Sequence, residues 1–363
     1  MTEASIGYAL DILEPERRKL KSRDREVFGA LIQLHSQNED LLANLSDVIR
    51  YMCSLQPAEF VMVSFSVELE RFVRDKRARS SQKTDKSARS QSDELRFASC
   101  FVQHMNDVLL NAPEAKTLRD TLKDSIGGKG SRNSERDRHR SRLFHILLHS
   151  FAHSLAASIS LCLWGGAYRT AYLFLSRPNA LDIHLTFLLE IDRLVETLER
   201  PLFRHLHIRM LEHDDAEGSG TMLFQALKSI LMILPQSTCY RVLKDRLVSA
   251  SRYRQSARPR SGVVTPPNGD TELLVRRVLQ VRALHCEVAW ERIRAESLET
   301  STREESTVDL EATRRSWVGR SDNESSKRTA FAMELKEGYQ DLKDEKWKLY
   351  WEGNELTVDD PAA

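Results

Sequence analysis

Three histidines are the residues of this sequence whose spacing most suggests chemistry. His145, His149 and His153 follow one another at intervals of four residues, so an unbroken helix presents all three on one face. A zinc site needs ligands that converge on one point, and residues spread along a single helix do not converge without a ligand from elsewhere. The sequence also lacks an HExxH motif. We therefore predict no metal site and interpret the histidines as packed against polar groups or partly wet.

Other residues that could support catalysis fail on spacing or placement. A thiolate loop closed by an arginine is shorter than the six residues that separate Cys162 from Arg169, so Cys162 is interpreted as a small core residue. Asp192, Glu196 and Glu199 fall on one predicted helix, whereas an acid–base pair should come from two elements that face a cleft. No serine stands in a GxSxG motif. The sequence thus predicts no enzyme, no catalytic residue and no cofactor.

Helices are the elements that would position any functional side chain. Apolar residues recur at helical spacing between Leu143 and Arg246. The clearest stripe runs down one helix face and consists of Phe187, Leu188, Ile191, Leu194, Val195 and Leu198. Pro201 and Pro235 mark later helix starts, and Gln236 or Ser237 can cap the last helix. Because such helices cannot bury their stripes alone, we predict an all-α fold of stacked antiparallel helical hairpins, a HEAT-like α-solenoid with disordered linkers.

The pattern divides the chain into four predicted parts. They are residues 1–77 (HEAT-like helical pairs), 78–92 (a basic disordered linker), 93–255 (the main helical domain) and 256–363 (a linker plus charged C-terminal helices). Helices outside the main stripe are expected near residues 6–20, 27–34, 41–52, 60–73, 115–124, 271–297 and 328–351.

Composition limits the classes of function. The 54 Lys and Arg residues against 53 Asp and Glu residues leave a net charge of +1, which does not favour nucleic-acid binding. Five cysteines without a CxxC pair, and an N-terminus that does not resemble a signal peptide, predict a reducing, cytosolic compartment. The stretch from Leu143 to Gly166 has the length of a membrane span, but it includes the three histidines and several serines. We expect two buried helices there instead.

Two basic runs keep an alternative open. Arg71 to Arg89 and Arg132 to Arg142 are rich in arginine, with lysine and serine interspersed. Such runs are most often solvated linkers, but they can also attract anionic lipid head groups. A basic lipid-surface-binding protein is therefore one alternative function. A helical-repeat adaptor with an unrelated partner is another.

A set of ordered motifs resembles one known family. The C-terminal domain of the vacuole morphology scaffold family, which organises the PIKfyve lipid kinase complex, has similar residues at compatible spacing over about residues 94–255. The main block consists of Ser160-Leu161-Cys162-Leu163, Tyr168, Ala171-Tyr172, Phe187-Leu188, Asp192, Leu194-Val195, Glu199, Pro201, Phe203, Ala226-Leu227 and Leu234-Pro235-Gln236-Ser237. Upstream, the similar residues are Leu95, Phe97-Ala98, Val102-Gln103, Leu118-Arg119 and Leu122-Lys123-Asp124.

The resemblance implies a non-catalytic scaffold. Members of this family bind a Sac-domain phosphoinositide phosphatase and self-associate through this domain, which would be residues 93–255 here. Their N-terminal repeats help to engage the PIKfyve-type lipid kinase. The complex makes and turns over phosphatidylinositol 3,5-bisphosphate, so the expected location is the cytosol and the cytoplasmic face of vacuolar and endosomal membranes, with only peripheral membrane contact. The N-terminal repeat array of the family is longer than the one found here.

The resemblance also nominates residues of a partner-binding or assembly domain. They are Leu161, Cys162, Leu163, Tyr168, Ala171, Asp192, Leu194, Val195, Glu199, Pro201, Phe203, Leu234, Pro235, Gln236 and Ser237. Aromatic residues and arginine are over-represented at binding hot spots. We therefore predict Tyr168, Arg169, Arg193 and Arg204 as exposed interface residues.

Overall fold

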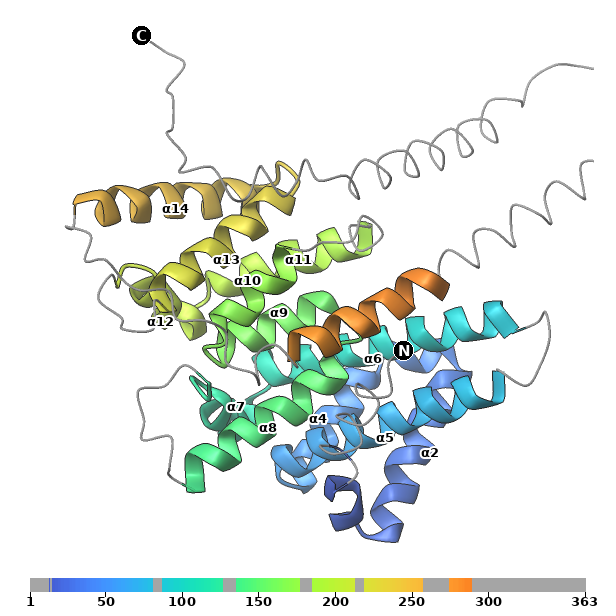
Figure 1. The fold of residues 1–363 in the computed structure, drawn as a ribbon. Coiled ribbons are helices and arrows are strands. Elements are labelled where there is room, and N and C mark those ends of the chain that lie inside the picture. The colour runs from blue at the N-terminus through green and yellow to red at the C-terminus, as the bar shows by residue number, and fades with distance from the viewer. Residues whose placement is uncertain are drawn as a thin grey trace, which may run out of the picture. The chain divides into compact units, whose positions relative to one another are not determined.

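The fold is helical throughout the part of the chain that the structure describes. The structure is a computed structural model, and it describes residues 13, 15–80, 87–126, 135–176, 185–212, 219–256 and 274–288. Every regular element in these ranges is a helix, and consecutive helices pack side by side (Figure 1). The predicted all-α, solenoid-like class is confirmed.

The first half of the described chain consists of a series of helices, two of which start at or directly after a proline. They are α2 (Ser22–Gln37), α3 (Glu39–Leu42), α4 (Leu45–Leu55), α5 (Ala58–Ser80), α6 (Ser87–Asn111), the short 3₁₀ helix η1 (Pro113–Ala115) and α7 (Lys116–Leu122). Pro57 immediately precedes α5, and Pro113 opens η1 because its fixed φ suits the first helical position.

The second half holds the stripe on which the fold prediction rested. Its elements are α8 (Glu135–Phe151), α9 (Leu155–Trp164), α10 (Tyr168–Leu175), α11 (Leu185–Leu198), η3 (Pro201–Phe203), α12 (Arg204–Arg209), α13 (Ser219–Ile233) and α14 (Thr238–Ser256). One further helix, without a label in Figure 1, spans residues 274–288 and is called the 274–288 helix below. The predicted stripe is buried as expected, since Ile191, Leu194, Val195 and Leu198 are each at most 5% exposed.

One apolar core crosses the predicted domain boundaries. It runs from Phe28 in α2 to Val278 in the 274–288 helix. The Phe65 ring of α5 stands edge-on to Phe28 at 4.8 Å and to Phe101 of α6 at 5.3 Å between ring centroids. Neither the linker predicted at 78–92 nor the boundary after residue 255 separates packing units among the described residues. By contact density the chain divides later, into Met1–Glu296 and Ser297–Ala363.

The linker prediction was too long at both ends. Helix α5 continues to Ser80 and α6 begins at Ser87, so residues 78–80 and 87–92 are helical. Serine and arginine there suggested disorder, but both residue types are tolerated on the exposed face of a helix. The helix predicted near 115–124 ends at Leu122, and residues 328–351 lie outside the described residues.

The apolar stretch at residues 143–166 is two buried helices, as predicted. A break at residues 152–154 separates α8 from α9, and Ser154 caps α9 by accepting a hydrogen bond from the Ala157 amide at 3.3 Å. All ten residues of α9 are buried, which explains why the segment shows no polar face. No helix among the described residues is long and apolar enough to cross a membrane.

Candidate partner-binding surface

Most of the nominated motif residues form the core and not the surface. Leu161, Cys162, Leu163, Ala171 and Phe203 are fully buried, and Leu194, Val195 and Leu234 are at most 6% exposed. Burial raises the pKa of the Cys162 thiol above its ordinary value. The interpretation of Cys162 as a core residue is therefore confirmed, because a thiol in that setting is not a nucleophile.

The acidic motif residues hold α11 against α14. The Ser237 hydroxyl donates to an Asp192 carboxylate oxygen at 2.6 Å and also accepts from the Tyr240 amide at 3.1 Å, so Ser237 is the N-cap of α14. About two turns further along α11, the Arg246 guanidinium donates to both carboxylate oxygens of Glu199, with one bond of 2.9 Å. Asp192 and Glu199 therefore have structural partners. They connect two helices by paired, directional bonds.

The four predicted interface residues differ in exposure. Tyr168 is only 2% exposed, so its prediction as an exposed residue was wrong. The prediction rested on the enrichment of aromatic residues at binding hot spots, but Tyr168 opens α10 and is packed into the core. Arg169 is half-buried, while Arg193 of α11 and Arg204 of α12 are exposed as predicted. Three further motif residues, Pro201, Pro235 and Gln236, are also exposed.

Two of the three predicted histidines belong to a buried polar cluster, and they do not share one helix, because α8 ends at Phe151 and His153 lies in the turn after it. His149 and His153 are 1% and 2% exposed and lie 3.7 and 3.3 Å from the Glu70 carboxylate of α5. Arg277 donates to the same carboxylate at 2.9 Å, and His285 lies 3.0 Å from His153, nitrogen to nitrogen. These contacts fasten the 274–288 helix to α5 and α8. No group of His, Cys, Asp or Glu among the described residues is arranged to hold a metal ion.

The pKa values of this cluster follow from its ion pair. Burial alone would raise the pKa of Glu70, but the Arg277 guanidinium, together with the nearby imidazoles of His149 and His153, lowers it well below its ordinary value. Burial lowers the pKa of His149. The cluster thus consists of a charged carboxylate paired with a guanidinium and flanked by imidazoles, and the ion pair connects α5 to the 274–288 helix.

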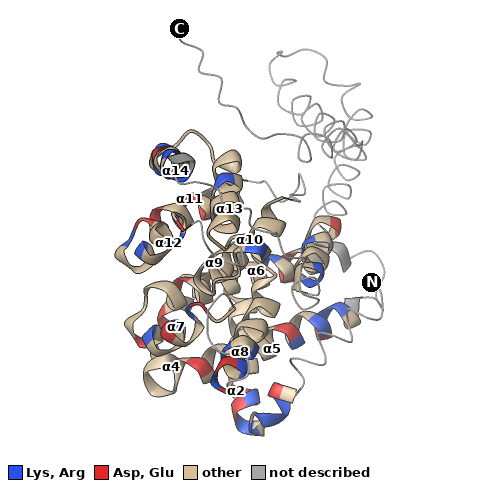
Figure 2. Cartoon of the chain, turned by 60° about the vertical axis from the view of Figure 1, so that its left-hand side comes forward, with Lys and Arg blue, Asp and Glu red and all other residues tan. Residues whose placement is uncertain are grey.

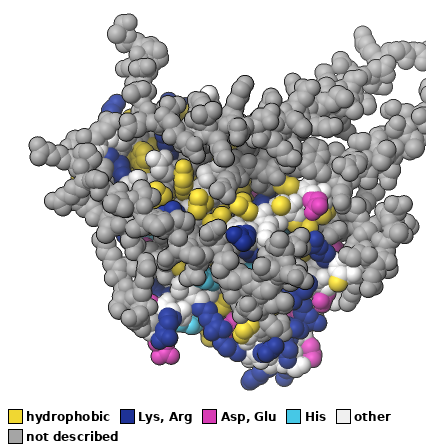
Figure 3. All heavy atoms as spheres, viewed as in Figure 1, with side chains coloured by type: hydrophobic (Ala, Val, Ile, Leu, Met, Phe, Trp, Pro, Cys, Tyr) yellow, Lys and Arg dark blue, Asp and Glu magenta, His cyan; other side chains and the backbone are white. Residues whose placement is uncertain are grey.

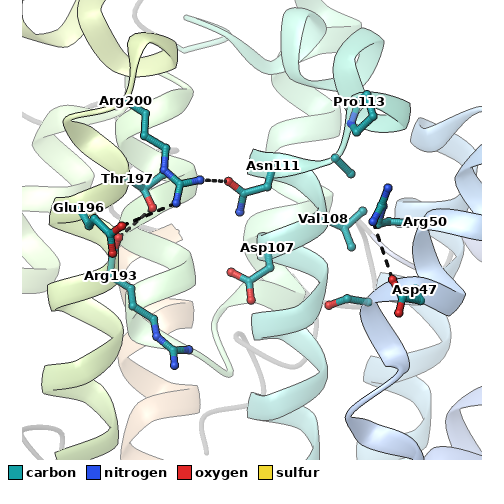
Figure 4. A pocket seen from close by; sticks show the side chains of 12 residues that line it. Asp47, Arg50, Asp107, Val108, Asn111, Pro113, Arg193, Glu196, Thr197 and Arg200 are labelled. Atoms are coloured by element: carbon teal, nitrogen blue, oxygen red, sulfur yellow. Dashed lines mark hydrogen bonds and ion pairs between the residues drawn. The ribbon is translucent and has the colours of Figure 1, made fainter.

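A polar groove lies between α4, α6 and α11. Its main part has a volume of about 510 Å³, and a deeper part of about 170 Å³ continues toward α9. Helix α6 lies between the other two helices in Figure 4, and it supplies Asp107 and Asn111 to both parts. Arg193 and Thr197 of α11 also line both parts. Among the lining residues, the sequence nominated Arg193 as an exposed interface residue, and Gln103, Ser160 and Leu194 belong to the family motif, but no groove was predicted.

Some charges of the groove are paired and others are not. Arg50 lies 3.8 Å from Asp47 and 3.4 Å from Glu114, and Arg200 donates to Asn111 at 2.7 Å. Neither the Arg193 guanidinium nor the Asp107 carboxylate forms a hydrogen bond or ion pair with a residue that the structure describes, although the Arg193 backbone carbonyl accepts from the Thr197 hydroxyl at 2.8 Å (Figure 4). Burial raises the pKa of Asp107, although His104 and Arg193 oppose the shift.

The inner end of the groove holds a partly desolvated carboxyl group. Glu190 of α11 accepts hydrogen bonds from the Gln103 amide and, at 3.4 Å, from the Ser154 hydroxyl. Burial raises its pKa to about 7. Gln103 was noted only as part of the family motif, and the sequence did not single out Glu190 or Asp107, because polar residues on a helix normally mark its solvated face. A signal was present all the same, since the polar residues of α6 fall on one side of a helix that is otherwise apolar.

The basic runs are partly engaged inside the protein. Arg71 lies 3.2 Å from Glu68 and 3.3 Å from Asp75, and Arg140 donates to the Thr121 and Lys123 carbonyls at 2.7 and 2.8 Å. Arg74, Arg136 and Arg138 of the two runs are exposed, and further exposed cations lie near the start of α2, at Arg18, Lys21 and Arg23. Figure 2 colours several Lys and Arg positions blue around α2, and Figure 3 shows basic side chains at the same end of the molecule. The lipid-surface alternative thus has fewer available cations in the two runs than their composition suggests.

Comparison with known proteins gives a consistent set of matches. A family model described as "Vacuolar protein 14 C-terminal Fig4p binding" matches residues 38–250. A protein named VAC14 homolog from Arabidopsis thaliana is 34% identical over 222 residues, which are 60% of this chain and 25% of that protein. A VAC14 homolog from Schizosaccharomyces pombe is 28% identical over 226 residues, 62% of this chain and 24% of its own length.

A more distant relative agrees. The vacuole morphology and inheritance protein 14 of Saccharomyces cerevisiae is 26% identical over 153 residues, 42% of this chain and 16% of that protein. The matched part of the chain therefore spans about a quarter or less of the length of these relatives. No solved structure matches the chain. The matched region begins before α4 and ends within α14, so it contains the groove and all the nominated motif residues.

Proposed function

This chain belongs to the Vac14 family, through its C-terminal Fig4p-binding region, and we propose that it is a non-catalytic scaffold that binds a Sac-domain phosphoinositide phosphatase. The observation that carries the proposal is the family match over residues 38–250, which coincides with one continuous helical core. The carboxylates that could have acted in catalysis also support a scaffold, because Asp192, Glu199 and Glu70 form hydrogen bonds that join helices.

The wider role follows from the same membership. We infer that the chain acts in the complex that synthesises and turns over phosphatidylinositol 3,5-bisphosphate, at the cytoplasmic face of vacuolar and endosomal membranes. We also infer that it self-associates. Contact with a PIKfyve-type lipid kinase is proposed either directly or through the complex, since the matched residues span only about a quarter of the relatives.

The candidate contact residues divide into two kinds. Arg193 and Arg204 are exposed and remain proposed contacts, whereas Tyr168 lies in the core, so its substitution tests folding and not binding. Arg169 is half-buried and follows Tyr168 in the sequence, so we rank it below Arg193 and Arg204 as a proposed contact residue. An exposed arginine can form two parallel hydrogen bonds with one carboxylate, because its guanidinium group is planar.

The proposal is tested by size-exclusion chromatography with light scattering. The full chain is run alone and then mixed with a Sac-domain phosphatase of the same organism, and a phosphoinositide phosphatase without a Sac domain serves as the control. We expect a homo-oligomer that shifts to a larger, co-eluting complex with the Sac-domain enzyme alone. A chain that ignores this enzyme would contradict the proposal and leave the adaptor with an unrelated partner as the better function.

A further inference from the structure

We propose that the groove between α4, α6 and α11 is the part of this surface that holds the partner, and that it takes an extended peptide segment with an acidic side chain placed at Arg193. The inference rests on the proposed function, because the phosphatase supplies the segment. It goes further by naming the site and the chemistry of the bound segment. Figure 4 shows the groove with α6 between the two helices that flank it.

The groove has a polar floor that helix packing does not require. Gln103, Asn106, Asp107 and Asn111 of α6 line it at positions i, i+3, i+4 and i+8, so they form one ridge. The other faces of α6 are core, where Phe101, Met105 and Leu109 are at most 1% exposed. An apolar floor would suit an amphipathic helix, whereas a row of side-chain amides and a carboxylate suits a backbone that presents its own N–H and C=O groups.

Two atoms at the groove are buried without a hydrogen-bond partner. One is the Asn106 amide oxygen, and the other is the hydroxyl of Ser160, a residue of α9 that is 1% exposed. Both residues line the deeper part of the groove. Buried polar atoms are nearly always hydrogen-bonded, to protein, water or ligand. A peptide N–H directed at Asn106 and a peptide carbonyl directed at Ser160 would satisfy both.

The dimensions fit a short extended segment. The ridge from Gln103 to Asn111 covers eight helical steps, or about 12 Å at 1.5 Å per residue. An extended chain covers the same distance with about four residues. The main part of the groove, about 510 Å³, has room for side chains on such a segment.

The charges select the side chain of the segment. Arg50 is matched by Asp47 and Glu114, and Arg200 by Asn111 and by Glu196 at 4.0 Å, so both are occupied within the protein. Arg193 has a guanidinium that faces the groove with no ion pair among the described residues. A carboxylate is the group that pairs best with it. The Asp107 carboxylate would repel a second acidic side chain nearby, and it can accept hydrogen bonds from the amide groups of the segment.

The test measures the affinity of the full chain for the Sac-domain phosphatase by biolayer interferometry. Arg193→Glu should weaken binding at least about ten-fold, and the milder Arg193→Gln and Asn106→Ala about three-fold or more, as expected of hot-spot contacts. Arg241→Glu is the matched control, because Arg241 is exposed on α14 and does not line the groove. The affinity of this control for the phosphatase should lie within about two-fold of that of the unaltered chain. Circular dichroism should show unchanged helicity for every variant.

The outcomes separate this inference from the proposed function. If the unaltered chain does not bind the phosphatase, the proposed function fails and the groove inference falls with it. If the unaltered chain binds and Arg193→Gln binds equally well, only the groove inference is overturned. The same is true if Arg193→Gln loses self-association and keeps the phosphatase, since the groove would then hold a second copy of the chain.

A photo-crosslink locates the segment directly. Benzoylphenylalanine at position 197 replaces Thr197, which lines both parts of the groove, and the control position is Met232, 70% exposed on α13. We expect position 197 alone to crosslink to the phosphatase, and the linked peptide to be one short stretch with an acidic residue. Crosslinking from position 232 alone, or from position 197 to another copy of this chain, would overturn the inference.

Discussion

Glu190 shows how one partly buried side chain makes the stability of this fold depend on pH. Burial raises its pKa to about 7, above the ordinary value of 4.5. A carboxyl group with a raised pKa stabilises the folded state below its unfolded pKa, and this contribution is lost as the pH rises through 7. We therefore predict that Glu190→Gln raises the free energy of unfolding at pH 8, by about 1–2 kcal/mol after allowance for solvent screening.

The measurement is chemical denaturation of the full chain at pH 5 and pH 8. Glutamine keeps the geometry, because its oxygen still accepts from Gln103 and its amide can donate to the Ser154 hydroxyl. The variant should gain stability at pH 8 and little at pH 5. Glu196→Gln, an exposed position on the same helix, is the control and should change little at either pH. A gain that is equal at both pH values would show that the Glu190 carboxylate is not the cause.

Single positions also show what the sequence could predict. Leu194 and Val195 were placed correctly in the core, because their spacing defines a stripe that only burial explains. Tyr168 was misplaced, because its residue type suggested a binding hot spot, whereas its side chain is packed into the core. The roles of Asp192 and Glu199 depend on partners 45 and 47 residues away, Ser237 and Arg246, which local periodicity does not reveal.

Each helix could be predicted from the sequence, but the helices that pack against one another could not. The stripe of α11 and the break between α8 and α9 follow from spacing and from residues that end helices. The groove depends on α4 and α11 flanking α6, although these helices are far apart in the sequence. The 274–288 helix was expected as a helix, but its docking on α5 and α8 appears only in the structure.

The docked 274–288 helix gives a prediction about one ion pair. Arg277 bonds to Glu70 across 207 residues, and both side chains are largely buried. Removal of one partner leaves a buried charge without compensation, which costs about 3–5 kcal/mol. We predict that Arg277→Ala releases the helix from α5 and α8. Hydrogen–deuterium exchange should show faster exchange of residues 274–288, while α11 and α13 keep their protection.

Two variants complete this experiment. Glu287→Ala, at an exposed position of the same helix, should leave the exchange unchanged. The double variant Arg277→Met with Glu70→Gln removes both charges and should recover much of the lost protection, because no unpaired charge then remains. Slow exchange of residues 274–288 in Arg277→Ala would show that their apolar side chains, Val278 and Val281 among them, suffice to hold the helix.

The continuity of the core decides which fragment can fold. Sequence patterns suggested residues 93–255 as an independent domain, yet α4 and α5 cover the inner face of α6. Phe97 and Phe101 pack edge-on against Phe72 and Phe65, with ring centroids 5.6 and 5.3 Å apart, and Phe101 is fully buried. Exposure of one such ring costs about 1.5–3 kcal/mol, and several exposed together approach the whole stability of a domain, about 5–15 kcal/mol.

We therefore predict that a fragment of residues 93–255 lacks the cooperative thermal unfolding of the full chain and binds a dye for exposed apolar surface. A fragment of residues 22–288 keeps α2 to α14 and the 274–288 helix, so it should unfold in one transition near the temperature of the full chain. The family match begins at residue 38, before α4, which agrees with a unit that includes α4 and α5. If residues 93–255 alone unfold cooperatively at the temperature of the full chain, the packing of α6 on α5 does not contribute to stability as proposed. If they fail to do so, a binding experiment on that fragment would report on exposed apolar surface, and the phosphatase must be tested against the longer unit.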